Sequence, residues 1–181
     1  PAVQIQVIKQ MKTRPRLIAM DTMNFWMESA MDDLKRVLGM VDILLVNDSE
    51  ARQLSGEFSI LKAAKKIMQM GPRYLVIKKG EHGALLFHEN NVFFAPALPL
   101  DDVFDPTGAG DTFAGGFMGH LAKTKDISFE NMKTAIIVGS ALASFCVEKF
   151  GPERLKEISH QAIQDRIQQF IQLVNFDFSL V

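Results

Sequence analysis

The chain has 181 residues, of which 48% are hydrophobic, and it carries a formal net charge of −1 with an isoelectric point near 6.5. This length is enough to bury the core of one ordinary globular domain. Because the charge is balanced and no run of Lys or Arg forms a continuous basic face, the composition gives no reason to expect a nucleic-acid partner.

The sequence also indicates the cellular compartment and argues against a membrane-spanning protein. Cys146 is the only cysteine, which excludes an intrachain disulfide and a thiolate metal cluster and fits a reducing, cytoplasmic location. The longest apolar run, 135–147, is shorter than the roughly 20 residues that a membrane span requires, so we expect no membrane partner. The start at Pro1 shows no export signal, and because it lacks an initiator Met we expect the chain to begin partway through a longer one.

Short aliphatic runs alternate along the chain with amphipathic helical patterns. The expected strands are 17–21, 43–46, 74–77, 84–87 and 92–95. The first three are almost continuously apolar, as buried parallel strands are, and the last two form a hairpin across the turn Glu89-Asn90-Asn91. This alternation predicts one α/β domain over residues 1–181, in which a mostly parallel sheet with a hairpin at one side is flanked by helices.

The expected helices each bury one apolar face. One helix covers Met27–Leu38 and is closed by Gly39. Another opens at Ser59, faces Leu61 and Ala64 inward, and ends at Gly71-Pro72. The final helix covers 159–174, and its expected core-facing side chains are Ile163, Ile167, Phe170, Ile171 and Val174. The tail after it is expected to dock through Phe176, Phe178 and Leu180, either on this chain or on a partner. A second copy of the chain, in a homo-oligomer, is one such partner.

Polar side chains and glycines follow three of the expected strands. In chain order they are Asp21, then Asn47 and Glu50, then Lys78, Gly80 and Gly83. Because ligands bind at the carboxyl ends of parallel strands, these residues are candidates for one site. Structural interpretations remain for each group: a local turn at Asp21, a capping box between Asn47 and Glu50, and a hairpin with solvated lysines after the third strand.

The stretch from Asp105 to Phe113 combines glycine freedom, a carboxylate and an expected helix start. Amides of the Gly108–Gly110 turn can converge on an anion at a helix N-terminus. A carboxylate beside a bound phosphate is electrostatically unfavourable, because both groups are negatively charged. The presence of Asp111 next to an anion-binding turn therefore requires an explanation. Asp111 either accepts a proton from an attacking hydroxyl or caps the helix that follows. The absence of Gly-Lys-Ser/Thr excludes a Walker P-loop, and Phe113 stands where a Rossmann site has its third glycine.

A long apolar helix follows Ser128 and runs to about Phe150. Small residues lie on more than one side of it, among them Gly139 and Ala143. Such residues let either a neighbouring backbone or a flat ring come close, so helix packing and a ligand contact both remain interpretations.

Asp105-Pro106-Thr107-Gly108-Ala109-Gly110-Asp111-Thr112-Phe113, followed by Gly115-Gly116, resembles the second signature of the PfkB, or ribokinase-like, family of carbohydrate kinases. Asn47-x-x-Glu50 and Lys78-x-Gly80-x-x-Gly83 are similar to the family's further nucleotide-site motifs, in the same order. The resemblance extends over nearly the whole chain. It implies a ribokinase-like fold and transfer of a phosphoryl group from ATP, with Mg²⁺, to a hydroxyl of a sugar or sugar-like substrate.

The resemblance also implies a role for each motif residue. The implied roles are catalytic base for Asp111; anion hole for Gly108, Ala109 and Gly110; organisation of Mg²⁺ and phosphate through water for Asn47 and Glu50; nucleotide contact for Lys78, Gly80 and Gly83; proximity to the adenine for Gly139 and Ala143; and a monovalent cation such as K⁺ at Asp105 and Thr107.

The family's N-terminal half carries a di-glycine signature, most sugar contacts and a β lid, and none of these is present in the 181 residues. We therefore expect the nucleotide-binding and catalytic-base part of the fold, with little turnover of its own, because orientation of substrate alone is worth about 7–11 kcal/mol of barrier. A nucleoside is the alternative acceptor. A non-catalytic nucleotide-binding or assembly fragment is the alternative from another class.

Overall fold

The computed structural model describes residues 1–175. They divide into two compact units: unit 1 comprises Pro1–Lys79 and Leu85–Phe93, and unit 2 comprises Gly80–Ala84 and the chain from Phe94 onward. The expectation of a single domain over residues 1–181 stays a prediction. The expected docking segment of the tail lies outside the described residues: Phe176, Phe178 and Leu180.

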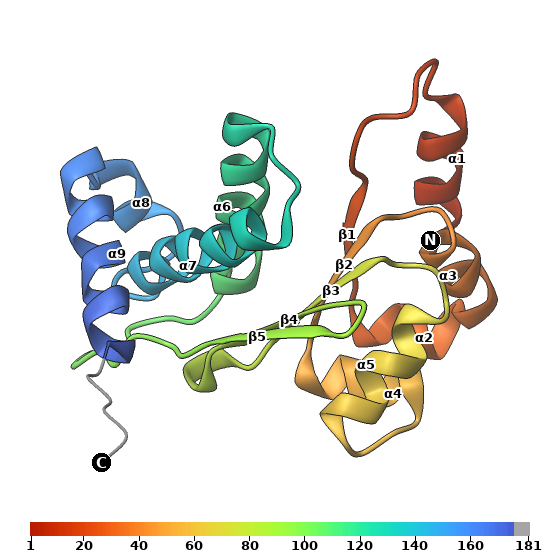
Figure 1. The fold of residues 1–181 in the computed structure, drawn as a ribbon, viewed down its shortest axis with the longest axis horizontal. Helices are drawn as coiled ribbons and strands as arrows, with labels where there is room; N and C mark the ends of the chain where they lie inside the picture. The colour runs from red at the N-terminus through yellow and green to blue at the C-terminus, as the bar shows by residue number, and fades with distance from the viewer. Residues whose placement is uncertain (176–181) are drawn as a thin grey trace, which may run out of the picture. The chain divides into compact units, whose positions relative to one another are not determined.

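A five-stranded sheet has the strand order β1-β2-β3-β4-β5 (Figure 1). Its strands are β1 Ala19–Asp21, β2 Ile43–Asn47, β3 Tyr74–Lys78, β4 Ala84–His88 and β5 Asn91–Ala95. The first three are parallel, with Met20 opposite Leu44 and Leu44 opposite Leu75. The connections before β4 and β5 are too short for a parallel crossover, so these strands reverse direction. The predicted mixed arrangement, parallel strands with a hairpin at one side, is confirmed.

Unit 1 surrounds its strands with five helices. They are α1 Ala2–Gln10, α2 Asn24–Ser29, α3 Met31–Leu38, α4 Asp48–Ser55 and α5 Ile60–Met68. Figure 1 shows α1 beside α3 and α4 beside α5, and these pairs are in contact. The core joins strand side chains such as Leu44 and Leu75 to helix side chains such as Leu34, all fully buried. Each such side chain contributes roughly 1.5–3 kcal/mol.

Two predictions about these helices are wrong in detail. The single helix expected over Met27–Leu38 is two helices, because the backbone at Ala30 leaves the helical region with φ −151° and ψ 43°. In α5, Leu61 is 58% exposed, whereas Ala63 and Ala64 are fully buried. The inward position expected for Ala64 is confirmed, and the prediction is wrong for Leu61 alone of the two.

Unit 2 is mostly helical. Its elements are the 3₁₀ turn η1 Gly80–His82 and the helices α6 Ala109–Thr124, α7 Phe129–Cys146, α8 Glu153–Glu157 and α9 His160–Val174. Helices α6 and α7 cross closely, because a Cβ atom on Gly116 would lie 3.0 Å from the Cα of Gly139. The turn that joins them is held by Asn131, whose side chain bonds to Thr124, His120 and the carbonyl of Asp126.

The apolar face predicted for α9 is only partly buried. Phe170 is buried, but Ile171 and Val174 are about half exposed. A polar contact holds α9 instead: the guanidinium of Arg166 stacks on the Phe145 ring, 3.9 Å from its centroid, and donates to Glu148 and Ser144. Apolar periodicity alone therefore overestimated how much of this helix faces the core.

Among residues 1–175, no helix is both long enough and apolar enough to cross a membrane.

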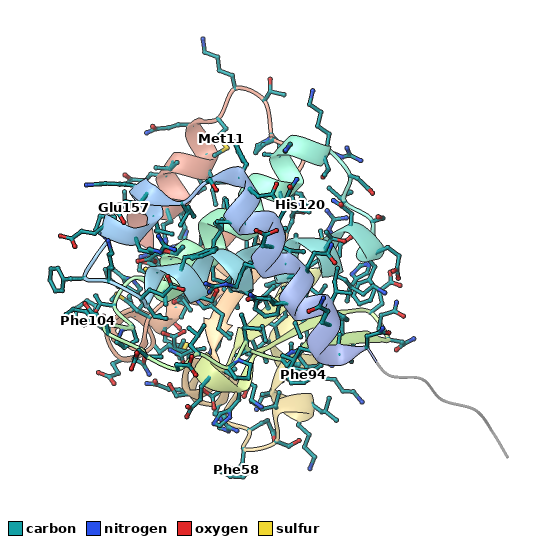
Figure 2. All side chains as sticks on the ribbon, turned by 90° about the vertical axis from the view of Figure 1, so that its left-hand side faces the viewer. Met11, Phe58, Phe94, Phe104, His120 and Glu157 are labelled. Carbon is teal, nitrogen blue, oxygen red and sulfur yellow. The ribbon has the colours of Figure 1, made fainter. Side chains whose placement is uncertain are left out.

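Phe58 of unit 1 and Phe104 of unit 2 project from the surface, as Figure 2 shows. Phe58 is not bare, because the guanidinium of Arg52 lies over its ring, 5.3 Å from the centroid.

Candidate functional site

In unit 1, β2 runs directly into α4 through Asn47, the helix N-cap. The side-chain oxygen of Asn47 accepts a hydrogen bond from the Glu50 amide at 2.8 Å, and Glu50 Oε2 accepts one from the Asn47 amide at 2.8 Å. The predicted capping box is confirmed. It pairs two donors at the helix start and fixes the Glu50 carboxylate at the end of the strand.

Glu50 lies in a polar but largely buried position. Burial is the main cause that raises the pKa of its carboxyl above the ordinary value of 4.5; the Asn47 amide opposes the rise, Asp21 adds to it, and Lys78 opposes it. A divalent cation nearby would favour the charged carboxylate. Since carboxylate and amide oxygens are ligands that Mg²⁺ takes, Glu50, Asp21 and Asn47 fit such an ion in donor type.

The ends of β1 and β3 are joined across β2 by an ion pair. Lys78 Nζ donates to Asp21 Oδ2 at 2.5 Å, and Asp21 Oδ1 accepts from the Thr22 amide at 2.9 Å. Within residues 1–175 the ammonium has no second hydrogen-bond partner, so two of its three donors remain available. The buried Thr22 hydroxyl oxygen is also without a partner among the described residues. No sequence signal marked Thr22.

In unit 2, the glycine turn opens the 16-residue helix α6. Gly108 is the N-cap and is left-handed, with φ 82°, a conformation that favours glycine. The helix-cap interpretation of Asp111 is therefore wrong, because Asp111 lies inside the first turn. Its carboxylate is exposed and makes no hydrogen bond or ion pair with any described residue.

The three amides expected to form an anion hole differ in their bonding. The Ala109 amide donates to the Pro106 carbonyl at 3.1 Å, so it is already used within the turn. Across the described part of the chain, the amides of Gly108 and Gly110 have no acceptor. Two of the three amides are thus available at the positive end of a helix.

The turn is anchored from behind by the end of α7. The amides of Phe104 and Asp105 donate to the Val147 carbonyl at 2.8 and 3.3 Å, and the buried Cys146 thiol donates to the Thr107 carbonyl at 3.8 Å. The Thr107 amide donates to Asp105 Oδ1 at 2.9 Å, and this hydrogen bond lowers the pKa of Asp105. The Asp105 carboxylate therefore has a structural role in the turn, and cation binding at Asp105 and Thr107 stays a prediction.

The remaining glycines differ in what requires them. Gly83 is left-handed, with φ 89°, and a Cβ there would lie 2.0 Å from the Ala95 carbonyl oxygen, whereas Gly80 faces open space. A Cβ on Gly139 would lie 2.7 Å from the Phe113 carbonyl oxygen, which favours the helix-packing interpretation for Gly139. Nucleotide contact at these glycines and at the half-buried Ala143 stays a prediction.

The predicted site residues thus fall into two groups, one in each unit. Unit 1 brings together Asp21, Asn47, Glu50 and Lys78. Unit 2 contains Gly80, Gly83, Asp105, Thr107, Gly108, Ala109, Gly110, Asp111, Gly139 and Ala143. Among residues 1–175 no cluster of three or more His, Cys, Asp or Glu side chains forms a ready metal site.

Comparison with known proteins agrees with this architecture. The pfkB family carbohydrate kinase profile matches residues 4–158. The cytidine kinase of Thermococcus kodakarensis is 34% identical over 98 residues, which cover 53% of this chain and 35% of that kinase. The ribokinase of Staphylococcus aureus is 31% identical over 122 residues, which cover 65% and 38%. The structure of Arabidopsis thaliana ribokinase complexed with ribose and ATP matches with a TM-score of 0.73 at 26% identity, covering 92% of this chain and 52% of that one.

The chain has a mixed sheet flanked by helices and a glycine turn that opens a long helix. This is the ribokinase-like fold, which the match to the solved ribokinase supports. The chain belongs to the pfkB family of carbohydrate kinases. It spans little more than a third of the two curated relatives and about half of the solved chain. The family and the fold expected from the sequence motifs are confirmed.

Proposed function

We propose that this chain is the nucleotide-binding and catalytic-base part of an ATP-dependent kinase that phosphorylates a hydroxyl group of a sugar or a nucleoside. The observation that carries the proposal is Asp111, an exposed carboxylate in the first turn of α6 that has no partner within residues 1–175. A catalytic base has to be free to accept a proton, and its free state next to a glycine turn distinguishes it from a structural cap.

The turn supplies what a phosphoryl group needs. The amides of Gly108 and Gly110 donate to its oxygens, and the positive end of α6 balances its negative charge. Asp111 takes the proton of the attacking hydroxyl, the hydroxyl oxygen forms the new bond to the terminal phosphorus of ATP, and ADP leaves. Family membership supports this assignment.

In unit 1, Glu50 and Asn47 would hold Mg²⁺ through water, with Lys78 beside the nucleotide phosphates. The ion neutralises phosphate charge when it is bound. The buried capping box fixes Glu50 without using up all of its lone pairs. A monovalent cation at Asp105 and Thr107 belongs to the same proposal.

The acceptor is either a sugar or a nucleoside. The names of the relatives support both: a ribokinase and a cytidine kinase share about a third of their residues with this chain over the matched stretch. A panel of sugars and nucleosides, assayed for ADP release, separates the two.

The test combines binding with turnover. ATP binding with Mg²⁺ is measured by calorimetry on this chain, and ADP release is measured over the acceptor panel on the complete kinase of which we propose it to be a part, in each case for the wild type and for Asp111→Asn. General base catalysis is worth about 10²- to 10⁴-fold, so turnover should fall by that factor while ATP affinity changes by less than about threefold. The control Asp165→Asn removes an exposed carboxylate on α9 and should change neither quantity. Full turnover by Asp111→Asn would refute the base assignment.

A non-catalytic nucleotide-binding or assembly fragment is the second candidate. It is favoured by the short span of the chain relative to its relatives and by the edge strand β5, on which Val92 and Phe94 are about half exposed. An unpaired apolar edge is a template for association. ATP binding without ADP release from any acceptor, together with a dimer or larger species on a sizing column, would favour this candidate.

A further inference from the structure

The ammonium of Lys78 has two carboxylates in its neighbourhood and pairs with one of them. Lys78 is directly opposite Asn47 in the register of β2 and β3. Glu50 folds back onto the amide of the same Asn47, at 2.8 Å. Lys78 and Glu50 therefore flank one residue. Nevertheless Lys78 Nζ bonds to Asp21 at 2.5 Å, and among residues 1–175 it makes no ion pair with Glu50 within 4.0 Å.

The carboxylate that pairs with Lys78 belongs to the more distant strand. Asp21 belongs to β1, so the lysine side chain passes over the end of β2 to reach it. Holding a long lysine side chain in one geometry costs conformational entropy. Asp21 offsets this cost because its own carboxylate is already oriented by the Thr22 amide and because the pair is largely screened from solvent, with 17% and 29% of the two side chains exposed.

We infer that Asp21 is a positioning residue that holds Lys78 away from Glu50 and so leaves the Glu50 carboxylate for the hydrated Mg²⁺ that accompanies ATP. The inference rests on the proposed function, because the Mg²⁺ role of Glu50 belongs to that proposal. The charges of Lys78 and Glu50 already act on each other. Without the charge on Asp21, Lys78 is free to pair with Glu50, and Mg²⁺ then has to displace an ammonium from that carboxylate.

The readout is the ratio of the ATP dissociation constants without and with Mg²⁺, measured by calorimetry on the 181-residue chain. For Asp21→Asn this ratio should fall by about tenfold relative to the wild type, which is about 1.4 kcal/mol. In a Lys78→Met background, Asp21→Asn should leave the ratio unchanged, because no ammonium remains to occupy Glu50. Asp21→Glu keeps the charge and should keep the wild-type ratio.

A matched control separates positioning from simple loss of an ion pair. Asp42 is another aspartate at a strand end of unit 1; it bonds to Arg14 and Arg73 and to the amide of Ile18. Asp42→Asn should lower the melting temperature and leave the Mg²⁺ ratio unchanged. Circular dichroism confirms that each variant is folded. If Asp21→Asn does not fold, the Lys78→Met chain tests the same idea, because it should keep at least the wild-type ratio.

The outcomes divide cleanly. Three outcomes overturn the inference and leave the proposed function standing. They are a wild-type ratio in Asp21→Asn, an equal fall in the Lys78→Met background, and an equal fall in Asp42→Asn. A wild-type chain that binds no ATP with or without Mg²⁺ overturns both. A fall that depends on the presence of Lys78 supports the inference.

Discussion

The two units hold their candidate residues in different ways. In unit 1 the side chains of Asn47, Glu50, Asp21 and Lys78 are all paired with one another or with nearby amides. In unit 2 the glycine turn is shaped by backbone conformation, and Asp111 has no partner in the part of the chain that the structure describes. Side-chain substitutions should therefore cost stability in unit 1, whereas in the turns of unit 2 the glycines should carry that cost.

Two glutamates make the same contrast in electrostatic terms. Burial raises the pKa of Glu50 in unit 1, and among the described residues no cation bonds to this carboxylate directly. Burial also acts to raise the pKa of Glu148 in unit 2, but hydrogen bonds from Arg166 and Arg154 outweigh it, and the pKa is lowered below the ordinary 4.5. One residue type thus has opposite pH behaviour in the two units.

The largest expected effect comes from breaking a backbone approach in unit 2. Gly83→Ala places a Cβ 2.0 Å from the Ala95 carbonyl oxygen at a left-handed position, so we expect a loss of about 2–3 kcal/mol in unfolding free energy. Gly80→Ala, in open space at φ 55°, should cost only about 1 kcal/mol. Urea denaturation of both variants measures the difference, and equal losses would contradict the role assigned to the close approach.

A smaller loss is expected from the paired edge of unit 1. Asn47→Ala removes the cap acceptor for the Glu50 amide and should lower the unfolding free energy by about 1 kcal/mol. Asn47→Asp keeps an acceptor and should restore most of it. If thermal denaturation finds Asn47→Ala as stable as the wild type, the capping box does not support this edge.

The pH dependence of stability should have opposite signs for the two glutamates. The raised pKa of Glu50 means that its contribution is greatest below pH 4.5 and is lost as pH rises through the folded-state pKa. The lowered pKa of Glu148 means that its contribution is present above pH 4.5 and is lost as pH falls through the folded-state pKa. Unfolding free energies of the wild type, Glu50→Gln and Glu148→Gln between pH 3 and pH 8 test both signs, and differences of the same sign would refute the contrast.

The smallest expected effect is on the stability of Asp111→Asn. Because the Asp111 carboxylate has no partner among the described residues, its loss should change the unfolding free energy by less than about 0.5 kcal/mol. Paired denaturation curves of this variant and Asn47→Ala set the two units side by side. A loss at Asp111 as large as the loss at Asn47 would mean that Asp111 is a structural residue.

Much of this arrangement could be predicted because local chemistry determines it. The spacing of Asn47 and Glu50 predicts a capping box, and the apolar strands predict the parallel part of the sheet, since both depend on neighbours in sequence. The break at Ala30 could not be predicted, because alanine favours helix and no glycine or proline marks the position. The choice by Lys78 of Asp21 over Glu50 depends on strand register and distant side chains.

Errors at the helix faces have a similar origin. Leu61 was expected in the core because it is large and apolar, but α5 buries Ala63, Ala64 and Ile67 and leaves Leu61 exposed. In α9, the apolar periodicity predicted that Ile171 and Val174 face the core, but both are about half exposed. Arg166 instead packs on the Phe145 ring. At the glycine turn, the carboxylate of Asp111 resembled a cap in sequence, whereas the left-handed backbone of Gly108 takes that place.

The division into two units gives the chain a pair of natural spectroscopic reporters. Its single tryptophan, Trp26, belongs to unit 1, where it packs against the core and meets Phe25 edge to face. Its single thiol, Cys146, is buried in unit 2 beneath the glycine turn. Tryptophan fluorescence therefore follows the unfolding of one unit, and the rate of thiol labelling follows the opening of the other. Recorded on the same sample without any substitution, the two signals reveal whether the two units unfold together or in succession.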